Sequence, residues 1–437
     1  MPRPRPRVLI LAEHCNPEWV SVPLVAWSLY HALSRITDAH LVTQIRNRDA
    51  MLRAGLLEGR DFTTIDTEFV ARRTNQLFNL LGGSKGIGWT INTALVAAAY
   101  PAFEHLAWKR FGCAIRAGRF DVVHRLTPLS PTVPSLIAAH CRRAGVPFVV
   151  GPLNGGVPWP RGFGHAQRKE REFLHYVRNA YKLLPGYHST RSDSAAILVA
   201  SRDTYRQLSR PFRHKAFYLP ENAIDPNRFS RRRTRKADRP LRLVFIGRLV
   251  PYKGPDLLLH AAAPLLKSGD VTLDIVGDGA LMPELKAIIE RENLPNVTLA
   301  GWVPHEKIQD RIADADLFAF PSIREFGGGV VLEAMAVGLV PVVIDYGGPA
   351  ELVTQKTGYL IPLGTRDQII DRFRQTLTYL TNNPPEIDAK SAHAIRRAHA
   401  QFTWDAKAGQ VIEIYRWLTG ASRQKPAFPM PTPDLNA

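Results

Sequence analysis

Two basic residues in the second half of the chain stand in a loop that could hold an anion. Arg248 and Lys253 are five residues apart in G-R-L-V-P-Y-K-G (247–254), directly after an apolar run. The glycine lets the chain turn, and the two cations lie just ahead of a helix opened by Pro255, so the loop could grip a diphosphate. Two exposed surface cations are the alternative that these residue types leave open.

Two acidic residues follow some seventy residues later. Glu325 and Glu333 belong to I-R-E-F-G-G-G-V-V-L-E-A-M-A (323–336), where Glu325 falls in a loop after a strand and Glu333 in a helix among apolar neighbours. Burying an unpaired charge is costly, so we expect hydrogen-bond donors around Glu333, and ligand hydroxyls are good candidates. A helix-dipole or capping role for Glu333 is the alternative.

The elements that must position these residues alternate along the chain. Short apolar runs are separated by amphipathic segments, which predicts parallel strands joined by crossover helices. The predicted strands are 8–12, 40–43, 121–124, 147–150, 197–200, 241–246, 271–276, 297–300, 317–320 and 341–344. We expect an α/β protein with two facing, doubly wound, Rossmann-like domains, whose ligands lie at the carboxyl ends of the strands in a deep cleft between the domains.

Composition shifts set the predicted domain boundaries. They give an N-terminal domain (7–218), a basic linker (219–240), a second domain (241–402), a helix that packs across the boundary (403–420) and a loose Pro-rich tail (421–437). The linker is predicted because its run of arginines and its proline have little to bury. Cap residues predict helices from Ser21 to about Ser34, from Pro255 to Gly269 and from Gly329 to Gly338.

Taken together, these motifs resemble the GT-B retaining glycosyltransferases of family 4. The hallmark is a pair of glutamates separated by seven residues, met here by Glu325 and Glu333. Also similar are P-E-N-A-I-D (220–225), the Arg-Lys loop and I-V-G-D-G (275–279). One departure is E-H-C-N-P-E-W-V-S (13–21) after the first strand, where many relatives have a Gly-Gly loop that faces the donor phosphates. This loop suggests a subfamily whose donor or acceptor site is shaped by Trp19 and its neighbours.

The resemblance implies a role for each matching residue. Arg248 and Lys253 would neutralise the donor diphosphate in place of a metal, Glu333 would hold the ribose hydroxyls and Glu325 would contact the transferred sugar. His124 corresponds to the N-domain active-site histidine of the family, with a structural histidine as the alternative. The other residues implied to lie at the donor are Asn222, Trp302, Val303, Phe326, Gly327, Gly328 and Gly329, with the base read by the backbone of Trp302-Val303.

Two further motifs are interpreted beside these. G-P-L-N-G-G (151–156) resembles the family's cleft loop, whose backbone could approach donor or acceptor closely. Asp314-Ala315-Asp316 has the spacing of a metal-binding D-x-D, but it stands where a helix enters a strand. We interpret it as a structural motif and expect no metal site.

Charge and cysteine content bound the partners. The chain of 437 residues carries 57 Lys plus Arg and 39 Asp plus Glu, which gives a net charge of +18. Residues 1–240 hold 37 of the basic and 17 of the acidic residues, a net charge of +20. This excess points to an anionic acceptor or membrane surface on the N-terminal side, and nucleic acid is not expected because no RNA motif or zinc module is found. Three scattered cysteines and the lack of a run of about 18 apolar residues predict a cytoplasmic protein, with peripheral attachment to the inner membrane face as the alternative.

The resemblance therefore implies a metal-independent retaining hexosyltransferase. It would move a hexosyl group from a UDP- or GDP-sugar to a hydroxyl of a glycan or lipid-linked acceptor, in bacterial polysaccharide biosynthesis. No cofactor is expected beyond the nucleotide diphosphate sugar, which is a co-substrate. The alternatives are a non-hydrolysing nucleotide-sugar epimerase of the same fold and, less favoured, a basic nucleic-acid-binding protein.

Overall fold

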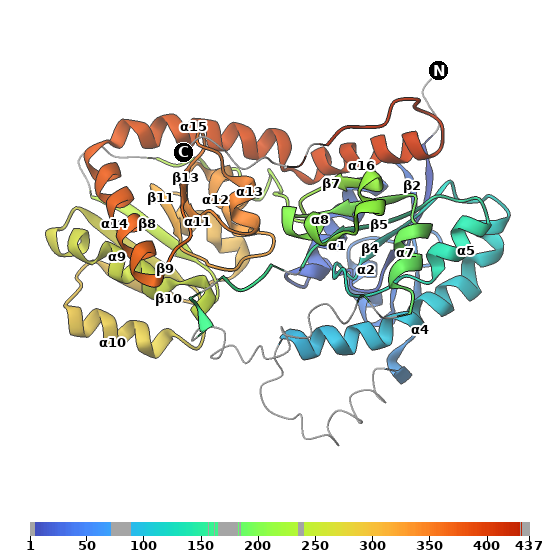
Figure 1. Cartoon of the computed structure of the whole chain (residues 1–437), viewed down its shortest axis with the longest axis horizontal. Helices are drawn as coiled ribbons and strands as arrows, with labels where there is room; N and C mark the ends of the chain where they lie inside the picture. Colours follow the sequence, from blue (N-terminus) through green and yellow to red (C-terminus); the bar gives the residue numbers. More distant parts are fainter. Residues whose placement is uncertain are drawn as a thin grey trace. The chain divides into compact units, whose positions relative to one another are not determined.

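The chain forms two compact α/β units in a computed structural model (Figure 1). The structure describes residues 5–70, 89–155, 157–160, 162–164, 182, 185–234, 240–428 and 430. Unit 1 consists of Met1–Gly156, Glu172–Glu221 and Trp404–Met430, and unit 2 of Val157–Arg171, Asn222–Thr403 and Pro431–Ala437. No helix among the described residues is both long and apolar enough to cross a membrane.

Unit 1 is built on a seven-stranded parallel sheet of order β3-β2-β1-β4-β5-β6-β7. Its strands are β1 (Arg7–Ala12), β2 (Asp38–Gln44), β3 (Phe62–Ile65), β4 (Val122–Thr127), β5 (Phe148–Leu153), β6 (Ala196–Val199) and β7 (Ala216–Tyr218). Its helices are α1 (Val22–Ser34), α2 (Arg48–Arg53), α4 (Trp89–Arg116), α5 (Ile137–Arg143), α7 (Tyr187–Asp193), α8 (Arg202–Gln207) and α16 (Trp404–Leu418). Buried side chains form a separate core on each face of this sheet, as expected for parallel strands covered on both sides.

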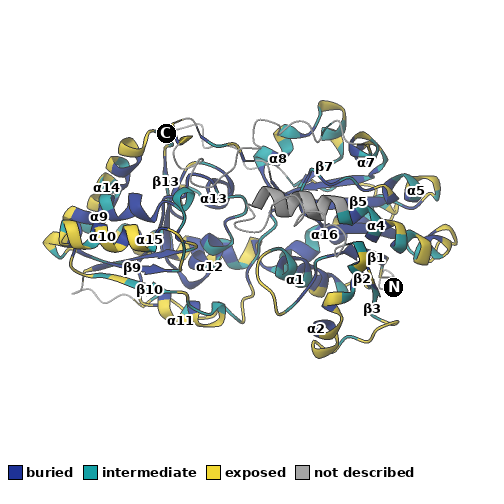
Figure 2. Cartoon of the chain, turned by 90° about the horizontal axis from the view of Figure 1, so that it is seen from below, coloured by how far each residue is buried: buried dark blue, intermediate teal, exposed yellow. Residues whose placement is uncertain are grey.

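Unit 2 is built on a six-stranded parallel sheet of order β10-β9-β8-β11-β12-β13. Its strands are β8 (Leu241–Ile246), β9 (Val271–Val276), β10 (Val297–Gly301), β11 (Leu317–Phe320), β12 (Val340–Ile344) and β13 (Tyr359–Ile361). Its helices are α9 (Pro255–Ser268), α10 (Met282–Glu292), α11 (Ile308–Ile312), α12 (Gly329–Val337), α13 (Gly348–Leu352), α14 (Arg366–Asn382) and α15 (Pro384–Gln401). The strands are largely buried, and exposed residues lie mainly on helices such as α10 and α14 (Figure 2).

These two parallel sheets confirm the predicted α/β class. All ten predicted strands are present, three of them with the predicted bounds: β8, β9 and β11. The helices predicted to close at Gly269 and Gly338 do so, each with its glycine in the left-handed region at φ 81° and 107°. Ser21 occupies the N-cap position of α1, but its side chain makes no capping hydrogen bond with a described residue.

The last helix, α16, belongs to unit 1. Its apolar face, including Val411, Ile414 and Tyr415, joins the core on one side of the seven-stranded sheet, and the helix packs against α1. In Figure 1 it is the red helix beside the strands of unit 1. The chain therefore leaves unit 1 after Glu221 and returns to it at Trp404.

The segment predicted as a basic linker is packed in part, although about half of its described residues are exposed. Ile224 and Phe229 are buried in the core of unit 2. The side chain of Arg233 is 5% exposed and pairs with Asp316 at 3.0 Å. An arginine counted as solvated charge is thus a buried ion-pair partner, and residues 235–239 lie outside the described residues.

The described part of the tail, predicted to be loose, is exposed or half-buried, but two of its side chains contact the rest of unit 1. Phe428 contacts the α16 side of the unit 1 core. The ammonium group of Lys425 lies 5.0 Å from the centre of the Phe217 ring and donates a hydrogen bond to the carbonyl of His214. Residues 431–437 lie outside the described residues.

Candidate functional site

The site in unit 2 is built on the loops that follow β8 and β11, which are neighbouring strands at the switch in strand order. Connections leave these two strands toward opposite edges of the sheet, and such a point is where ligands of doubly wound sheets bind. The Tyr252 carbonyl accepts hydrogen bonds from the Ile323 amide (2.9 Å) and the Ser322 hydroxyl (3.1 Å). The Arg-Lys loop and the loop of Glu325 are therefore fixed to each other through the backbone.

Lys253 and Glu325 form an ion pair at this point. The Lys253 ammonium donates to Oε2 of Glu325, and the two side chains are only 13% and 18% exposed. Arg248 lies in the same loop, and its guanidinium donates to the Tyr252 hydroxyl. The sequence named these three charged residues, and the structure places Lys253 against Glu325. Tyr252 was not predicted, although its place between Arg248 and Lys253 was a signal.

Glycines hold the site by close backbone approach. A Cβ atom on Gly277, of the I-V-G-D-G motif, would lie 1.9 Å from the carbonyl oxygen of Gly247. A Cβ on Gly348, after β12, would lie 2.2 Å from the carbonyl oxygen of Phe326, and the Gly348 amide donates to the Glu325 carbonyl at 3.0 Å. Only a residue without a side chain fits at either position.

Glu333 lies on α12 and is held by a histidine. Nε2 of His305 lies 2.7 Å from Oε1 of Glu333, and the Glu333 side chain is 17% exposed. The expectation of hydrogen-bond donors around this carboxylate is met by His305, which the sequence reasoning missed. The signal was its place three residues after Trp302, in the loop already marked for base recognition.

The other predicted donor residues surround this framework. Trp302 is 74% exposed, whereas Val303 packs against the core of unit 2. The side-chain amide of Asn222 lies close to Gly329 at the start of α12. A Cβ atom on Gly329 would stand 3.1 Å from Oδ1 of Asn222. Gly328 is the N-cap of α12 with a left-handed φ of 65°.

Phe326 and Gly327 complete the turn between Glu325 and α12, which is braced by residues 157–160. The Arg324 guanidinium lies 5.1 Å from the centre of the Phe326 ring and 5.0 Å from that of Trp159, and its Nε donates to the Val157 carbonyl at 3.1 Å. The Tyr346 hydroxyl donates to the Pro158 carbonyl at 2.9 Å. Aromatic and arginine side chains thus hold this turn against residues 157–160.

The structure gives Asp316 of the D-x-D spacing a structural role. Its Oδ1 accepts from Arg233 and its Oδ2 accepts from the Arg242 amide at 2.9 Å, and the side chain is 1% exposed. Asp314 is exposed and lies 3.5 Å from Arg242. Both oxygens of Asp316 are occupied, which agrees with the interpretation of this motif as structural.

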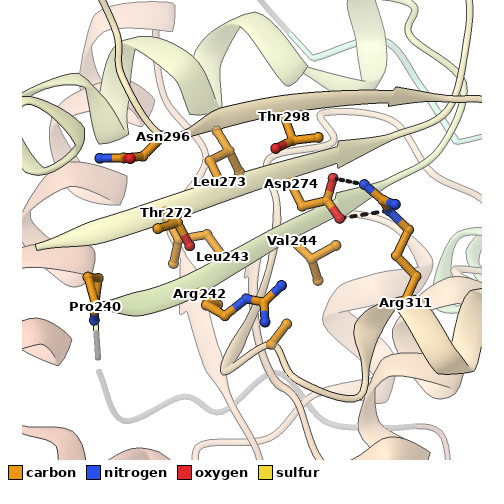
Figure 3. Close-up of a pocket in the computed structure, with 11 residues that line it drawn as sticks. Pro240, Arg242, Leu243, Val244, Thr272, Leu273, Asp274, Asn296, Thr298 and Arg311 are labelled. Carbon is orange, nitrogen blue, oxygen red and sulfur yellow. Dashed lines mark hydrogen bonds and ion pairs between the residues drawn. The ribbon is translucent and has the colours of Figure 1, made fainter. Parts of the chain in front are cut away.

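A pocket of about 620 Å³ lies elsewhere on unit 2 (Figure 3). It opens on the first halves of β8 and β9, and Arg311 pairs with Asp274 across it at 2.8 Å. None of its lining residues is a predicted site residue, and its position is away from the carboxyl ends where the charged loops lie. It is therefore not the candidate site.

In unit 1, His124 is buried within the sheet. It is 0% exposed, Nδ1 lies 2.5 Å from the Tyr415 hydroxyl and Nε2 lies 2.7 Å from the Gly151 carbonyl. Burial lowers the pKa of His124 to about 4, so the ring is neutral near pH 7. These contacts favour the structural alternative for His124, and its contact with the transferred sugar stays a prediction. The next predicted loop, 151–156, follows β5, and Gly156 lies outside the described residues.

One segment of the second unit is similar to a known protein family. Residues 226–394 match the family model "Glycosyl transferases group 1". This matched segment, the group 1 domain, covers less than half of the chain and is similar to that family. The domain contains Arg248, Lys253, Glu325 and Glu333, but it ends short of Asn222 and His124 on the N-terminal side.

Two similar proteins are named for different glycosyl transfers. Alpha-D-kanosaminyltransferase of Streptomyces kanamyceticus is 29% identical over 244 residues, which are 52% of this chain and 62% of that protein. A D-inositol 3-phosphate glycosyltransferase of Kineococcus radiotolerans is 33% identical over 195 residues, 40% of this chain and 43% of that one. The chain thus spans less than two thirds of the length of these relatives.

The whole chain has the fold of solved GT-B glycosyltransferases. Anabaena HepE, whose crystal structure contains UDP and glucose, superposes with a TM-score of 0.58 over 94% of this chain and 99% of that one, at 17% identity. At this identity the likeness establishes the architecture, and it extends over unit 1, which lies outside the group 1 domain. The GT-B fold expected from the sequence is confirmed.

Proposed function

We propose that the protein is a retaining glycosyltransferase that moves a hexosyl group from a nucleotide diphosphate sugar to a hydroxyl acceptor. The observation that carries this proposal is the Lys253–Glu325 pair, with Arg248 in the same loop, at the switch point of the group 1 domain. Two cations suit a diphosphate and a carboxylate suits sugar hydroxyls. HepE, a neighbour in fold, binds UDP and glucose, which supports a donor of this class.

The two cations would act on the leaving group. As the sugar departs, negative charge grows on the diphosphate, and Arg248 and Lys253 would stabilise that charge more than they stabilise the bound donor. Only such differential stabilisation accelerates the chemical step. We assign to these residues the work that a metal ion does in other glycosyltransferases, so activity is expected to persist in a chelator.

The carboxylates would orient the donor. Glu325 would exchange its contact with Lys253 for one with the transferred sugar, which frees the ammonium for the diphosphate. Glu333 would accept hydrogen bonds from the ribose hydroxyls beside His305, and the backbone of Trp302-Val303 would read the base. Asn222 and the amides of Phe326–Gly329 would complete the binding of sugar and phosphates at the start of α12.

Retention is proposed from the role of Glu325. A double displacement needs a carboxylate on the face of the sugar opposite the leaving group, as in retaining glycosidases. We assign Glu325 to sugar binding, beside the cation that faces the diphosphate, rather than to that opposite face. We therefore favour attack on the same face as the departing phosphate, with a phosphate oxygen accepting the proton of the acceptor hydroxyl.

The acceptor is proposed to be a glycan or a lipid-linked glycan of bacterial polysaccharide synthesis, met at the inner face of the membrane. Residues 1–240 carry a net charge of +20, whereas residues 241–437 carry −2. The anion-rich partner would therefore face the N-terminal half. Pelleting with phosphatidylglycerol liposomes at low salt, and loss of pelleting at high salt, would support this location, whereas no pelleting at low salt would contradict it.

A thermal-shift screen followed by product analysis tests the function. We expect one of UDP, GDP or ADP to raise the melting temperature in wild type and not in Lys253→Ala, because a ligand that binds only the folded state stabilises it. The matching sugar nucleotide should then be consumed with EDTA present, giving a product with the anomeric configuration of the donor by NMR. Formation of the donor's epimer without acceptor would support the epimerase instead. If no nucleotide sugar stabilises the protein or is consumed, the proposed function is wrong.

A further inference from the structure

The first strands of the two units occupy equivalent places. Each sheet has its first strand beside its fourth, β1 beside β4 in unit 1 and β8 beside β11 in unit 2, with the second and third strands on one side. The switch point of unit 1 is therefore at the carboxyl ends of β1 and β4. In unit 2 the loop after the first strand holds Arg248 and Lys253. In unit 1 the equivalent loop begins at Glu13.

The backbone of this loop is fixed by the two neighbouring strands. The Glu13 carbonyl accepts hydrogen bonds from Nδ2 of Asn47 (2.9 Å), from the Gln44 amide (3.3 Å) and from the Thr43 hydroxyl (3.3 Å). The Thr127 hydroxyl, at the end of β4, lies 3.2 Å from the amide and 3.3 Å from the carbonyl of His14. Glu13 is thus held in place through its main chain.

The Glu13 side chain differs from this satisfied backbone. It is 6% exposed, and its Oε2 has no hydrogen-bond partner among the described residues. The charged groups that face it are His14, whose Nδ1 lies 3.7 Å from Oε2, and Arg46. Burial raises the pKa of Glu13 to about 7 against the opposing effect of Arg46, and lowers the pKa of His14 to about 4. A neutral His14 does not balance the carboxylate near pH 7.

A buried carboxyl group with an oxygen that lacks a hydrogen-bond partner lowers the stability of the fold. Its presence therefore needs an explanation other than stability. Strained or unsatisfied groups of this kind are commonly kept for ligand binding at the expense of stability. The chemistry of the ligand follows from the group. A carboxyl oxygen accepts O–H or N–H donors and repels phosphates, so the diphosphate of the donor does not fit it.

We propose that Glu13 is a binding residue for the acceptor, and that its carboxyl group receives a hydrogen bond from a sugar hydroxyl at the switch point of unit 1. This proposal rests on the proposed glycosyltransferase function. It assigns the loop 13–21, which departs from the Gly-Gly pattern, to the acceptor. The residues assigned to the donor belong to unit 2, which leaves this position in unit 1 for the second substrate.

Stability measurements test the proposal without any substrate. At pH 8.5, where Glu13 is ionised, we expect Glu13→Met to raise the melting temperature by several degrees, because a residue of similar volume replaces an unpartnered charge. Asn47→Ala is the matched control within the same cluster. It removes the donor to the Glu13 carbonyl and should lower the melting temperature. If Glu13→Met is destabilised like Asn47→Ala, Glu13 serves folding and the proposal is wrong.

Kinetics with the donor found in the thermal-shift screen give the second test. Octyl β-D-glucoside is the probe for the acceptor because it presents sugar hydroxyls, and donor hydrolysis by water is the reference reaction. We expect Glu13→Gln to raise the KM for octyl β-D-glucoside at least tenfold, with donor hydrolysis and the donor KM within twofold of wild type. A raised donor KM with an unchanged KM for octyl β-D-glucoside would assign the hydroxyl to the donor sugar and overturn the proposal, as would no change in either constant.

The two tests separate the possible failures. If wild type consumes no nucleotide sugar, the proposed function fails, and the stability of Glu13→Met still decides whether Glu13 is a ligand-binding group. If wild type is active and Glu13→Gln is equally active toward octyl β-D-glucoside, only the inference about Glu13 fails.

Discussion

Nε2 of His305 lies 2.7 Å from Oε1 of Glu333, so an imidazole of the loop after β10 orients the carboxylate that we assign to the ribose. We predict that Glu333→Ala weakens binding of the nucleotide found in the thermal-shift screen about ten- to a hundredfold, the range for losing hydrogen bonds to a charged group. His305→Ala should weaken it less, and His305→Gln, which can still donate, should recover part of the loss. Isothermal titration calorimetry measures all three. Tighter binding by His305→Ala would mean that the histidine competes with the ribose.

Lys253 is predicted to act on the leaving group. Lys253→Ala should lower kcat/KM for the donor by about 10²–10³, the usual range for removing one preorganised donor from a developing anion. Steady-state kinetics with the authentic donor measure this value. Lys267→Ala is the matched control, because Lys267 is an exposed lysine in the last turn of α9. Unchanged kcat/KM in Lys253→Ala would refute the leaving-group role.

Gly348 is predicted to set the position of Glu325. Gly348→Ala would place a methyl group against the Phe326 carbonyl, 2.2 Å away, and push the turn that carries Glu325 out of place. Because a misplacement of 1 Å costs up to about 10²-fold in rate, we expect a loss of that size in kcat. Gly409→Ala in α16 is the control, since a Cβ there meets nothing within 4 Å. It should keep full activity and stability.

The buried pair of Arg233 and Asp316 is predicted to stabilise unit 2. Arg233→Ala leaves Asp316 buried with a lost partner, so the free energy of unfolding should fall by about 3–5 kcal/mol. Arg231→Ala removes an exposed pair with Asp310 and should cost about 1 kcal/mol or less. Urea denaturation of both variants gives the comparison. Equal costs would mean that the burial of Arg233 contributes nothing to stability.

His124 is predicted to make the protein sensitive to acid. The pKa of His124 is about 4 in the folded chain, against an ordinary value of 6.5. As the pH falls from 6.5 to 4, the histidine is therefore protonated in the unfolded state but stays neutral in the folded state. The free energy of unfolding should therefore decrease over this window, by up to about 3 kcal/mol for this residue. Denaturant titrations of wild type and His124→Gln at pH 7.5, 5.5 and 4.5 measure the difference. A constant difference between the two proteins across these pH values would contradict this origin.

The fold was largely predictable because the central strands carry continuous apolar runs. The three missed strands, β3, β7 and β13, lie at sheet edges and have only three or four residues each. An edge strand pairs on one side only, so a short segment such as F-T-T-I suffices and gives a weak signal. The N-terminal bound of β10, another edge strand, was predicted because Val297 begins a clear apolar run.

The site was predictable where loops follow central strands. Lys253 and Glu325 meet because β8 and β11 are neighbours, which follows from the topology of the family. The pairing of His305 with Glu333 was not predictable, since 28 residues separate them and no spacing rule links a loop histidine to a helix. The burial of His124 was not predictable either, because its hydrogen-bond partner Tyr415 is 291 residues away in the sequence.

The return of α16 to unit 1 has a consequence for synthesis on the ribosome. Residues 222–403 of unit 2 are contiguous, so their fold can form as they emerge. The core of unit 1 lacks Val411, Ile414 and Tyr415 until the last helix has been made, although its strands are translated first. The second unit to be translated is thus the first that can complete its core, and a nascent chain stalled near residue 400 exposes an unfinished apolar face on unit 1.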